Sequence, residues 1–351
     1  MKRVAIIPGD GIGVDVTAEA VQVLKAAAAR FGLEVSFREW DLGAERYLRE
    51  GVTIRDEEFR ELAETSDGIL LGALGDPRVP SNVHARDILL GLRFKLDLYV
   101  NFRPSLLLHP SLTPLKGFEE RAIRLEIFRE NTEDLYVDLG GRFRADTPNE
   151  VAIQESIHTR YGVERIVRAA FEHARARGRG RVTLVDKANA MPSAGALWRR
   201  VFREVGEGFT GIDRDMMYVD AVAMDLVRRP DRYEVIVTSN LFGDILSDLA
   251  AELTGGLGLA PSANIHPGRI GLFEPVHGSA PDIAGKGIAN PLGAIRSAAL
   301  LAEHLGSLEM ADAIEAAARA SILEGIRTPD LGGTASTEEV GGWITERVQR
   351  A

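Results

Sequence analysis

The chain alternates short apolar runs with longer segments in which apolar residues recur every three to four positions. Residues 4–7 form the first run, and a glycine-rich turn separates it from helical spacing at residues 14–31. Short apolar runs predict buried strands and the longer period predicts helices, so the chain begins with a strand, a turn and a helix. The same pattern predicts strands at residues 33–37, 68–71, 123–128, 182–185, 217–219 and 235–238.

Helical spacing fills most of the intervals between these strands. Strands that alternate with helices form largely parallel sheets, so the predicted fold class is α/β. Residues 137–157 depart from this pattern, because two glycines precede Val151, Ile153 and Ile157 at even spacing. The spacing predicts a protruding β-arm. An arm with an apolar side favours a symmetric dimer, although a simple exposed hairpin has the same pattern.

Composition limits the possible partners. A chain of 351 residues exceeds what one ordinary core supports, so we expect two domains or one large α/β unit with an insertion. A formal net charge of −10 disfavours nucleic acid, and no apolar stretch is long enough to span a membrane. The N-terminus passes directly into a strand pattern, which favours a cytoplasmic protein. Because the chain has no cysteine, a metal would need oxygen or imidazole ligands.

A glycine-rich segment at residues 277–290 combines few bulky side chains with His277, Asp282 and Asn290. Glycines at 278, 285 and 287 let backbone amides approach a ligand, and a lone carboxylate suits a ribose diol. The segment therefore predicts a nucleotide cofactor, with a long surface loop as the alternative.

The turn at residues 9–13 is a weaker signal for a nucleotide. It follows the first strand, but Val14 stands where the dinucleotide fingerprint needs its third glycine, and the Gly-Lys pair of a phosphate-binding loop is absent. A Rossmann fold and a kinase-like phosphate site are therefore both disfavoured. The remaining interpretations are a tight turn near a site and a purely structural turn.

Asp244 and Asp248 lie four residues apart on a predicted helix, so both carboxylates share one face. Like charges at this spacing destabilise an isolated helix, which favours a cation near them. Asp220, just after a predicted strand, is a third candidate ligand, and Mg²⁺ or Mn²⁺ suits such a set. Leu241, Ile245 and Leu249 are expected to anchor the opposite, buried side of the helix. The alternative is a solvated acidic face.

Candidate acid–base and anion-binding residues follow other predicted strands and one helix. Lys187 ends a strand, where a lysine with a lowered pKa can act as a base, although a lone lysine is usually a surface charge. Arg93, Arg103 and Arg129 could bind a substrate with two carboxylates through bidentate contacts. Each arginine alone would be interpreted as a surface ion pair.

Together these motifs resemble the β-decarboxylating dehydrogenase family, whose members act on 3-isopropylmalate, isocitrate, homoisocitrate, tartrate or D-malate. The similarity extends from residues 8–13 to residues 328–333. It implies an isopropylmalate dehydrogenase-like two-domain fold that is not a Rossmann fold. The cofactor-binding domain would comprise residues 1–98 and 254–351. Residues 99–253 would carry the metal site, the dimer interface and the arm at about residues 137–157.

The resemblance also implies a role for individual residues. Tyr136 and Lys187 would be the acid–base pair, and Asp220, Asp244 and Asp248 would bind Mg²⁺ or Mn²⁺. The substrate-binding residues would be Leu89, Leu90, Arg93, Arg103, Arg129 and Asp220. The residues that would bind the cofactor are Asn189, Glu274, His277, Gly278, Ser279, Ala280, Asp282, Ile283 and Asn290. Homodimers would share active sites, with Lys187 and Asp220 from one subunit and the arginines, Tyr136, Asp244 and Asp248 from the other.

The cofactor implied by the resemblance is NAD. The pair Asp282–Ile283 is similar to the NAD-using members, whereas NADP-using isocitrate enzymes carry Lys-Tyr there. A carboxylate accepts the ribose hydroxyls and repels a 2′-phosphate. The expected reaction is the oxidative decarboxylation of a 3-substituted malate to a 2-oxo acid and carbon dioxide.

The features that separate the members by substrate disagree. Leu89 and Leu90 make this helix similar to the corresponding region of isopropylmalate enzymes, which act in leucine biosynthesis. They disfavour homoisocitrate and isocitrate as substrates, because the additional carboxylate of these molecules would be unpaired against the two leucines. Residues 140–142 and 150–155 are more similar to tartrate and D-malate enzymes, and residues 129–136 to isocitrate enzymes. Isopropylmalate is the first candidate, and D-malate or tartrate the second. A non-catalytic regulatory subunit is the alternative from another class, but it would be expected to lose acid–base or metal residues.

Overall fold

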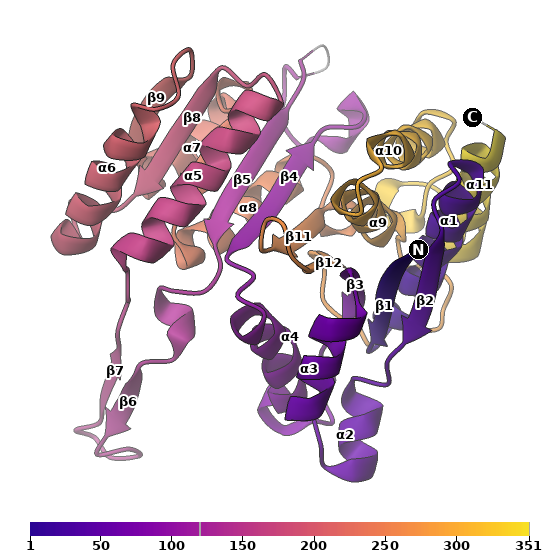
Figure 1. Ribbon diagram of the computed structural model, residues 1–351, viewed down its shortest axis with the longest axis horizontal. Helices are drawn as coiled ribbons and strands as arrows, with labels where there is room; N and C mark the ends of the chain where they lie inside the picture. The colour runs from indigo at the N-terminus through magenta and orange to yellow at the C-terminus, as the bar shows by residue number, and fades with distance from the viewer. Residues whose placement is uncertain (119–120, 351) are drawn as a thin grey trace. The chain divides into compact units, whose positions relative to one another are not determined.

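The computed structural model describes residues 1–118 and 121–350. Unit 1 comprises Met1–Leu98, Leu106–Ala122 and Ala251–Ala351, and unit 2 comprises Tyr99–Ser105 and Ile123–Ala250. Both ends of the chain belong to unit 1 (Figure 1). Residues 106–122 were expected in the second domain but belong to unit 1, where Arg327 Nη1 donates to Ser111 Oγ at 3.3 Å.

Unit 1 contains five strands in the order β2-β1-β3-β12-β11. β1 pairs in parallel with both β2 and β3, β3 pairs in parallel with β12, and β12 pairs antiparallel with β11. The strand bounds are Lys2–Gly9 (β1), Val35–Glu39 (β2), Gly68–Ala73 (β3), Pro261–Ile265 (β11) and Gly271–Pro275 (β12). β3 is buried along its whole length, as its continuous apolar run predicts.

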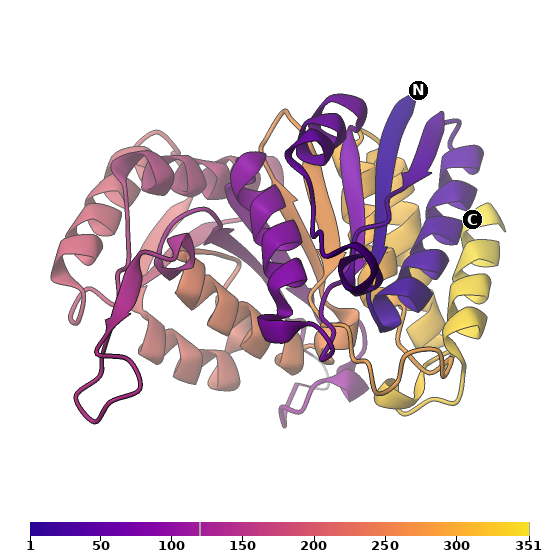
Figure 2. The same ribbon diagram turned by 90° about the horizontal axis from the view of Figure 1, so that it is seen from below.

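The helices of unit 1 come from both ends of the chain. Their bounds are Ile12–Arg30 (α1), Ala44–Glu50 (α2), Asp56–Thr65 (α3), Val83–Lys95 (α4), Leu292–His304 (α9), Leu308–Leu323 (α10) and Thr337–Arg350 (α11). The first helix packs on the last: α1 contacts α9 and α11, and Figure 2 shows the C-terminal helices beside it. A second cluster of buried residues, which includes Phe59, Leu62 and Ile88, packs α3 and α4 against β1 and β3.

Unit 2 contains the strands β4-β5-β10-β8-β9. β10 pairs in parallel with β5 and β8, and β8 with β9. The strand bounds are Val100–Leu106 (β4), Arg124–Glu130 (β5), Arg181–Asp186 (β8), Asp213–Tyr218 (β9) and Val235–Thr238 (β10). The helices are Arg160–Ala176 (α5), Pro192–Gly206 (α6), Val219–Arg228 (α7) and Asn240–Leu253 (α8). The α/β architecture with parallel pairing confirms the predicted fold class.

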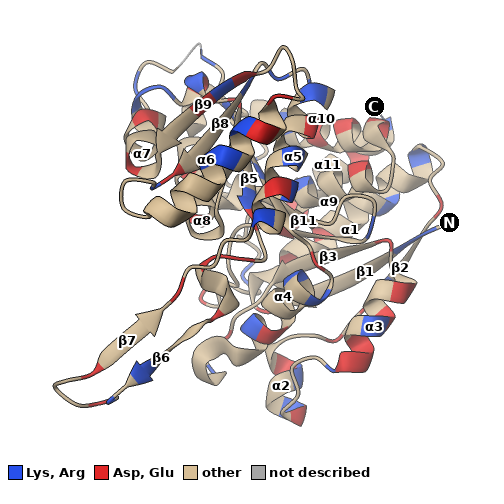
Figure 3. Ribbon diagram, turned by 60° about the vertical axis from the view of Figure 1, so that its left-hand side comes forward, with Lys and Arg blue, Asp and Glu red and all other residues tan. Residues whose placement is uncertain are grey.

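The predicted arm is a two-stranded antiparallel ribbon of β6 (Gly140–Phe143) and β7 (Val151–Gln154). It projects from unit 2 in Figure 1, and Figure 3 shows few charged residues on its strands. Phe143 is 61% exposed and Ile153 is 54% exposed. The apolar side of the arm is therefore exposed to solvent in the single chain.

Three local expectations were wrong. The strand expected at residues 33–37 starts at Val35, because Leu33 N still donates to Ala28 O at 2.9 Å. Val219 was expected in a strand but begins α7. Ile245 was expected to be buried, yet it is 55% exposed, and Leu246 (0%) and Ala250 (2%) form the buried stripe of α8. Among the residues that the structure describes, no helix is long and apolar enough to cross a membrane.

Candidate active site

The exposed edge of α8 presents Asp244 and Asp248 to two arginines of neighbouring strands. Arg129 of β5 pairs with Asp244, and its Nε donates to Asn240 Oδ1 at 2.8 Å. Nη1 of Arg103, on β4, lies 3.4 Å from Asp244 Oδ1 and 3.1 Å from Asp248 Oδ1. The two aspartates therefore share a face, as predicted, and the cation between them is a guanidinium.

Tyr136 belongs to the same group of side chains. It lies in a short 3₁₀ turn, Leu135–Val137, and its hydroxyl donates to Asp244 Oδ2 at 2.8 Å. The Arg129 guanidinium lies 5.0 Å from the centroid of the Tyr136 ring. We call Arg103, Arg129, Tyr136, Asp244 and Asp248 the arginine–aspartate cluster. It joins residues that the sequence separates by more than one hundred positions.

A glycine allows α8 to approach β5 this closely. A Cβ at position 243 would lie 2.6 Å from the Cβ of Arg129, which is shorter than real side chains tolerate. Arg129 is only 1% exposed, so its charge is balanced by protein groups rather than by water. Burial raises the pKa of Asp248 against the opposing charge of Arg103, and the Asp244 carboxylate raises it further. The cluster therefore retains repulsion between its carboxylates, which a bound cation would relieve.

Lys187 and Asp220 form a separate pair in unit 2. Lys187 follows β8, Asp220 lies in the first turn of α7, and Nζ is 2.7 Å from Asp220 Oδ1. The hydrogen bond from Lys187 lowers the pKa of Asp220. Across residues 1–118 and 121–350, no three His, Asp or Glu side chains form a group that could hold a metal ion. Asp220 of one chain therefore does not join Asp244 and Asp248 of the same chain.

Arg93 and Glu274 form a buried ion pair in unit 1. Arg93 Nη2 lies 3.0 Å from Glu274 Oε1, which also accepts from Asn264 Nδ2 at 2.8 Å. The Nε of Arg93 is buried with no hydrogen-bond partner among the described residues. A buried guanidinium N–H without a partner is destabilising unless a ligand binds it. Leu89 and Leu90, on the same helix α4, are half-buried.

The segment at residues 277–290 lies against the turn after β1. Ile12 N donates to Ser279 O at 2.8 Å, and a Cβ at Gly11 would lie 2.1 Å from that oxygen. The first turn thus needs its glycine for close approach to this loop, which explains a motif that fits no dinucleotide fingerprint. Ala280 has φ 36, a strained value for a non-glycine residue.

Two predicted cofactor residues in the loop present groups without protein partners. His277 Nδ1 lies 3.0 Å from Gly278 O, and its Nε2 is buried without a described partner. Burial lowers the pKa of His277, so the ring is neutral near pH 7 and Nε2 is an acceptor when Nδ1 donates. Asp282 is exposed.

The other predicted cofactor residues have mixed surroundings. Asn290 is buried. Its Nδ2 donates to Asp330 Oδ2 at 2.9 Å and its Oδ1 accepts from Leu292 N at 3.0 Å, so this side chain helps to hold the loop in place. Ser279 is also buried, while Gly278 is exposed and Ala280 and Ile283 are half-buried. Asn189 lies in unit 2 and is exposed.

Asp10 and His84 support this site and were missed by the sequence analysis. The Asp10 carboxylate accepts from Ala44 N at 2.6 Å and Gly75 N at 2.8 Å, and it lies 2.8 Å from His84 Nε2. His84 is 0% exposed. Asp10 thereby fixes the loop after β3 beside Ser279, since a Cβ at Gly75 would lie 3.2 Å from Ser279 Oγ. The only available signal was an aspartate inside the glycine turn.

The comparisons with known proteins agree over the full length of the chain. The family model described as isocitrate/isopropylmalate dehydrogenase matches residues 3–344. A 3-isopropylmalate dehydrogenase of Corynebacterium jeikeium is 50% identical over 350 residues, covering 99% of this chain and 100% of the relative. The protein of the same name from Thermobifida fusca is 47% identical and covers 99% and 97%.

Two solved structures are also similar. An isocitrate dehydrogenase from Methylococcus capsulatus has a TM-score of 0.90 and 38% identity, and covers 99% of this chain and 100% of that one. A β-decarboxylating dehydrogenase from Thermococcus kodakarensis has a TM-score of 0.82 and 41% identity, and covers 100% and 97%. Similarity of fold therefore extends to proteins named for different substrates, and the substrate must be argued from the site.

Proposed function

The chain belongs to the isocitrate/isopropylmalate dehydrogenase family, and we propose that it catalyses the NAD-dependent oxidative decarboxylation of 3-isopropylmalate. The observation that carries this proposal is the arginine–aspartate cluster, which joins anion-binding groups, two carboxylates and a phenol at one place. A reaction that needs a bound carboxylate, a divalent cation and a proton donor requires these groups together. Relatives that cover the whole chain at 47–50% identity and carry this name support the substrate.

The residues of the chain have distinct roles in the proposed reaction. Arg93, Arg103 and Arg129 bind the carboxylates of the malate. Lys187 accepts the proton of the C2 hydroxyl as the hydride leaves C2, and Tyr136 protonates the carbon from which carbon dioxide departs. One proton is released from the hydroxyl and one is taken up by the carbon. The net reaction therefore converts 3-isopropylmalate and NAD⁺ into the 2-oxo acid, carbon dioxide and NADH. A bound divalent cation supplies electrostatic stabilisation of the negative oxygen.

Asp220, Asp244 and Asp248 would hold Mg²⁺ or Mn²⁺. Oxygen ligands suit these cations, and the repulsion between Asp244 and Asp248 supports a cation at this face. Since Asp220 lies apart from the other two aspartates within one chain, the full set requires a second subunit. We therefore propose a homodimer in which Lys187 and Asp220 of one subunit complete the cluster of the other, with the arm and its exposed Phe143 at the interface.

The loop at residues 277–290 would bind the adenosine part of NAD. The neutral ring of His277 offers Nε2 as an acceptor for the adenine amino group. The exposed carboxylate of Asp282 would accept the ribose hydroxyls and repel a 2′-phosphate. The expected cytoplasmic location and the exclusion of nucleic acid and membrane as partners remain predictions.

D-malate or tartrate is the second candidate substrate. The half-buried Leu89 and Leu90 favour an alkyl substituent over a hydroxyl, because they offer no hydrogen bond. A panel of steady-state rates tests the choice, with NAD or NADP against 3-isopropylmalate, D-malate, tartrate, isocitrate and homoisocitrate. We expect the largest kcat/KM with NAD and 3-isopropylmalate, and activity that disappears with EDTA and returns with Mn²⁺. A larger kcat/KM for D-malate would replace the substrate, and activity without divalent metal would refute the role of the three aspartates.

A further inference from the structure

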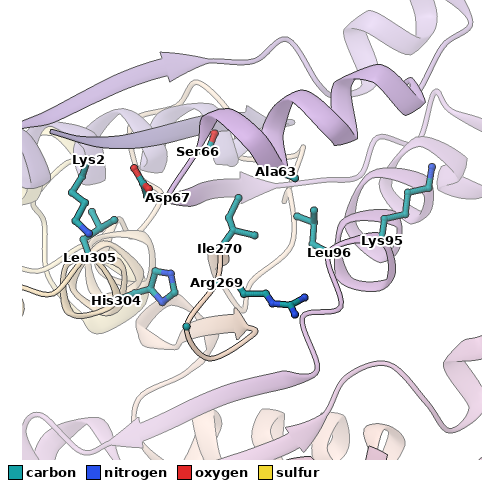
Figure 4. A pocket seen from close by; sticks show the side chains of 11 residues that line it. Lys2, Ala63, Ser66, Asp67, Lys95, Leu96, Arg269, Ile270, His304 and Leu305 are labelled. Carbon is teal, nitrogen blue, oxygen red and sulfur yellow. The ribbon is translucent and has the colours of Figure 1, made fainter.

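Unit 1 contains a cavity of about 670 Å³ that none of the proposed active-site residues lines. Figure 4 shows the Lys2 ammonium beside Leu305, whereas the Arg269 side chain turns toward Leu96. One anion could therefore not pair with both cations, and the cavity wall does not form an anion site. A set of connected hydrogen bonds with no role assigned so far lies instead in unit 2, at the base of the arm.

Four side chains at the base of the arm are joined by hydrogen bonds. Trp198 of α6 donates its Nε1 hydrogen to His158 Nδ1 at 3.2 Å, and His158 Nε2 lies 2.7 Å from Ser156 Oγ. Ser156 donates in turn to Asp134 Oδ1. We call Asp134, Ser156, His158 and Trp198 the arm-base network. It joins the segments that precede and follow the arm to each other and to α6.

The hydrogen bonds of the arm-base network have a defined direction. An indole nitrogen can only donate, so His158 Nδ1 is an acceptor and the ring hydrogen of a neutral imidazole is on Nε2. Nε2 then donates to Ser156 Oγ, which leaves the hydroxyl hydrogen of Ser156 for the Asp134 carboxylate. Burial lowers the pKa of His158 against the opposing effect of the Asp134 carboxylate, so the ring is neutral near pH 7, as this direction requires.

Asp134 connects the network to α8, the helix of two proposed metal ligands. Its Oδ2 accepts from Leu241 N at 3.0 Å, in the first turn of that helix, where the helix dipole stabilises a carboxylate. Asp134 is 3% exposed and has φ 67, a conformation that a non-glycine residue keeps only where its surroundings hold it. Its backbone is held as well, because Asp134 N donates to Ile157 O at 2.8 Å.

The turn that carries Tyr136 contacts α8 in two ways. The Tyr136 hydroxyl donates to Asp244 Oδ2 at 2.8 Å. Two residues earlier in the sequence, Asp134 accepts from the α8 backbone, and Asn240 Nδ2 donates to Glu133 O at 3.2 Å. In the proposed reaction the phenol must leave Asp244 to protonate a carbon, and Asp244 must bind the cation. The position of Tyr136 then depends on the contacts of residues 133 and 134.

We propose that Asp134 is a positioning residue for the proton donor Tyr136. Ser156 and His158 orient the Asp134 carboxylate so that it holds the turn of Tyr136 against α8. This role rests on the proposed function, because it concerns the step in which Tyr136 protonates the substrate. Hydride transfer precedes that step and depends on Lys187, so a displaced Tyr136 should slow complete turnover more than the first formation of NADH.

Ser156→Ala removes the hydroxyl that joins His158 to Asp134. We expect kcat to fall about tenfold and each KM to change less than about twofold, because displacing a reacting group slows the reaction without removing a binding contact. Stopped-flow absorbance measures NADH in the first turnover, and its rate should stay within about twofold of the wild type. Thr210→Ala removes an exposed hydroxyl of the same unit and should change neither rate.

Two variants of His158 separate orientation from packing. His158→Gln retains an amide donor near the position of Nε2 and should keep at least about half of the wild-type kcat, whereas His158→Leu has no donor and should lose about tenfold. In His158→Leu and Ser156→Ala the ratio of kcat in H₂O to kcat in D₂O should rise, because proton transfer then limits the rate. Equal losses in the Gln and Leu variants would overturn the proposal, as would first-turnover NADH formation that slows as much as kcat.

Amide hydrogen exchange without substrate measures the anchoring independently of the reaction. Ser156→Ala and His158→Leu should speed exchange at residues 134–138 and 240–244 by about threefold or more, whereas His158→Gln and Thr210→Ala should not. Unchanged exchange in the first two variants would refute the positioning role. A wild type that forms no NADH from 3-isopropylmalate would refute the proposed function instead, and hydrogen exchange would still decide whether the network holds Asp134 against α8.

Discussion

The arginine–aspartate cluster and the loop at residues 277–290 are built in opposite ways. In the cluster, charged side chains of β4, β5 and α8 hold one another, and Arg129 is almost fully buried at 1% exposure. The loop is held mainly through its own backbone atoms: Thr337 N donates to Gly287 O at 2.9 Å, Ile12 N donates to Ser279 O at 2.8 Å, and Gly285 N donates to Asp15 Oδ2 at 2.9 Å. The side chain of Asp282 remains exposed to solvent.

This difference predicts how each region responds to a ligand and to substitution. A substrate or cation must displace ion pairs in the cluster, so its side chains serve both stability and binding. A cofactor adds contacts to the loop without displacing any contact of Asp282. Substitutions in the cluster should therefore change stability and turnover together, whereas substitutions at Asp282 should change only the cofactor preference.

The largest effect is expected from the two proposed proton-transfer residues. Lys187→Ala and Tyr136→Phe should each lower kcat by about 10³-fold, because general acid–base groups contribute this much. Both variants should remain folded, since Lys187 and Tyr136 are at least partly exposed. Steady-state assays with 3-isopropylmalate and NAD measure the loss, and near-normal turnover by either variant would refute its role.

Mixing these two inactive variants tests whether subunits share active sites. In a heterodimer with shared sites, the Lys187→Ala subunit contributes an intact Tyr136 to the intact Lys187 of its partner. One of the two sites is then normal, so random reassociation of equal amounts should restore about a quarter of the wild-type rate, by the twofold symmetry of the dimer. If both residues acted within one chain, every site would carry one defect and the mixture would stay inactive.

Arg129→Met tests the coupling of stability and binding in the cluster. Removing the guanidinium takes one ion pair from Asp244, which keeps Arg103 and Tyr136, and leaves Asn240 Oδ1 without its donor, so we expect a loss of about 2 kcal/mol in the free energy of unfolding and a large rise in KM. Denaturant unfolding measures the first and substrate titration the second. Arg124→Met on the same strand is the control, because Arg124 is 55% exposed and should contribute under about 1 kcal/mol. If Arg129→Met and Arg124→Met lowered the free energy of unfolding equally, the burial of Arg129 would not make the cluster more important for stability than an exposed ion pair.

The sequence predicted features that local spacing determines. The shared face of Asp244 and Asp248, the β-arm and most of the parallel strands follow from periodicity within one segment. Contacts between distant segments were not predictable in this way. The Asp10–His84 contact joins residues 74 positions apart, and Arg93–Glu274 joins residues 181 positions apart.

The buried face of α8 was the clearest error. Leu241, Ile245 and Leu249 form an apolar stripe, but packing against β5 requires Gly243 and leaves Ile245 exposed in the single chain. An apolar stripe therefore identifies a face that avoids water, and it does not identify which partner covers it.

A smaller effect, on selectivity alone, is expected at the loop. Asp282→Lys with Ile283→Tyr should shift the ratio of kcat/KM for NADP over NAD by about 100-fold, since a repulsive charge becomes an attractive one beside the 2′ position. The thermal midpoint should change little, because Asp282 is exposed and Ile283 is only half-buried. Asp312→Lys, on an exposed position of α10, makes the same charge change outside the loop and should leave the ratio unaltered. If the double substitution changed the thermal midpoint but not the preference for NAD over NADP, the proposed difference between the loop and the arginine–aspartate cluster would be wrong.

The smallest effect concerns the framework that carries the loop. Asp15 on α1 accepts from Gly285 N at 2.9 Å, and Glu19, one turn later, is buried where α1 packs on α11. Burial, with a contribution from Glu338, raises the pKa of Glu19 from its usual value of 4.5 to about 7. The folded protein therefore binds more protons than the unfolded chain between these two values, and its stability falls as the pH rises through this window.

Glu19→Gln should remove this pH dependence, because the amide stays neutral. We expect the variant to gain about 2 kcal/mol over the wild type between pH 5 and pH 8.5, measured as the difference in unfolding free energy. Glu338→Gln, which removes the second cause, should give a smaller gain of the same sign. If the difference in unfolding free energy between the variant and the wild type were the same at pH 5 and pH 8.5, Glu19 would be solvated in both the folded and the unfolded state.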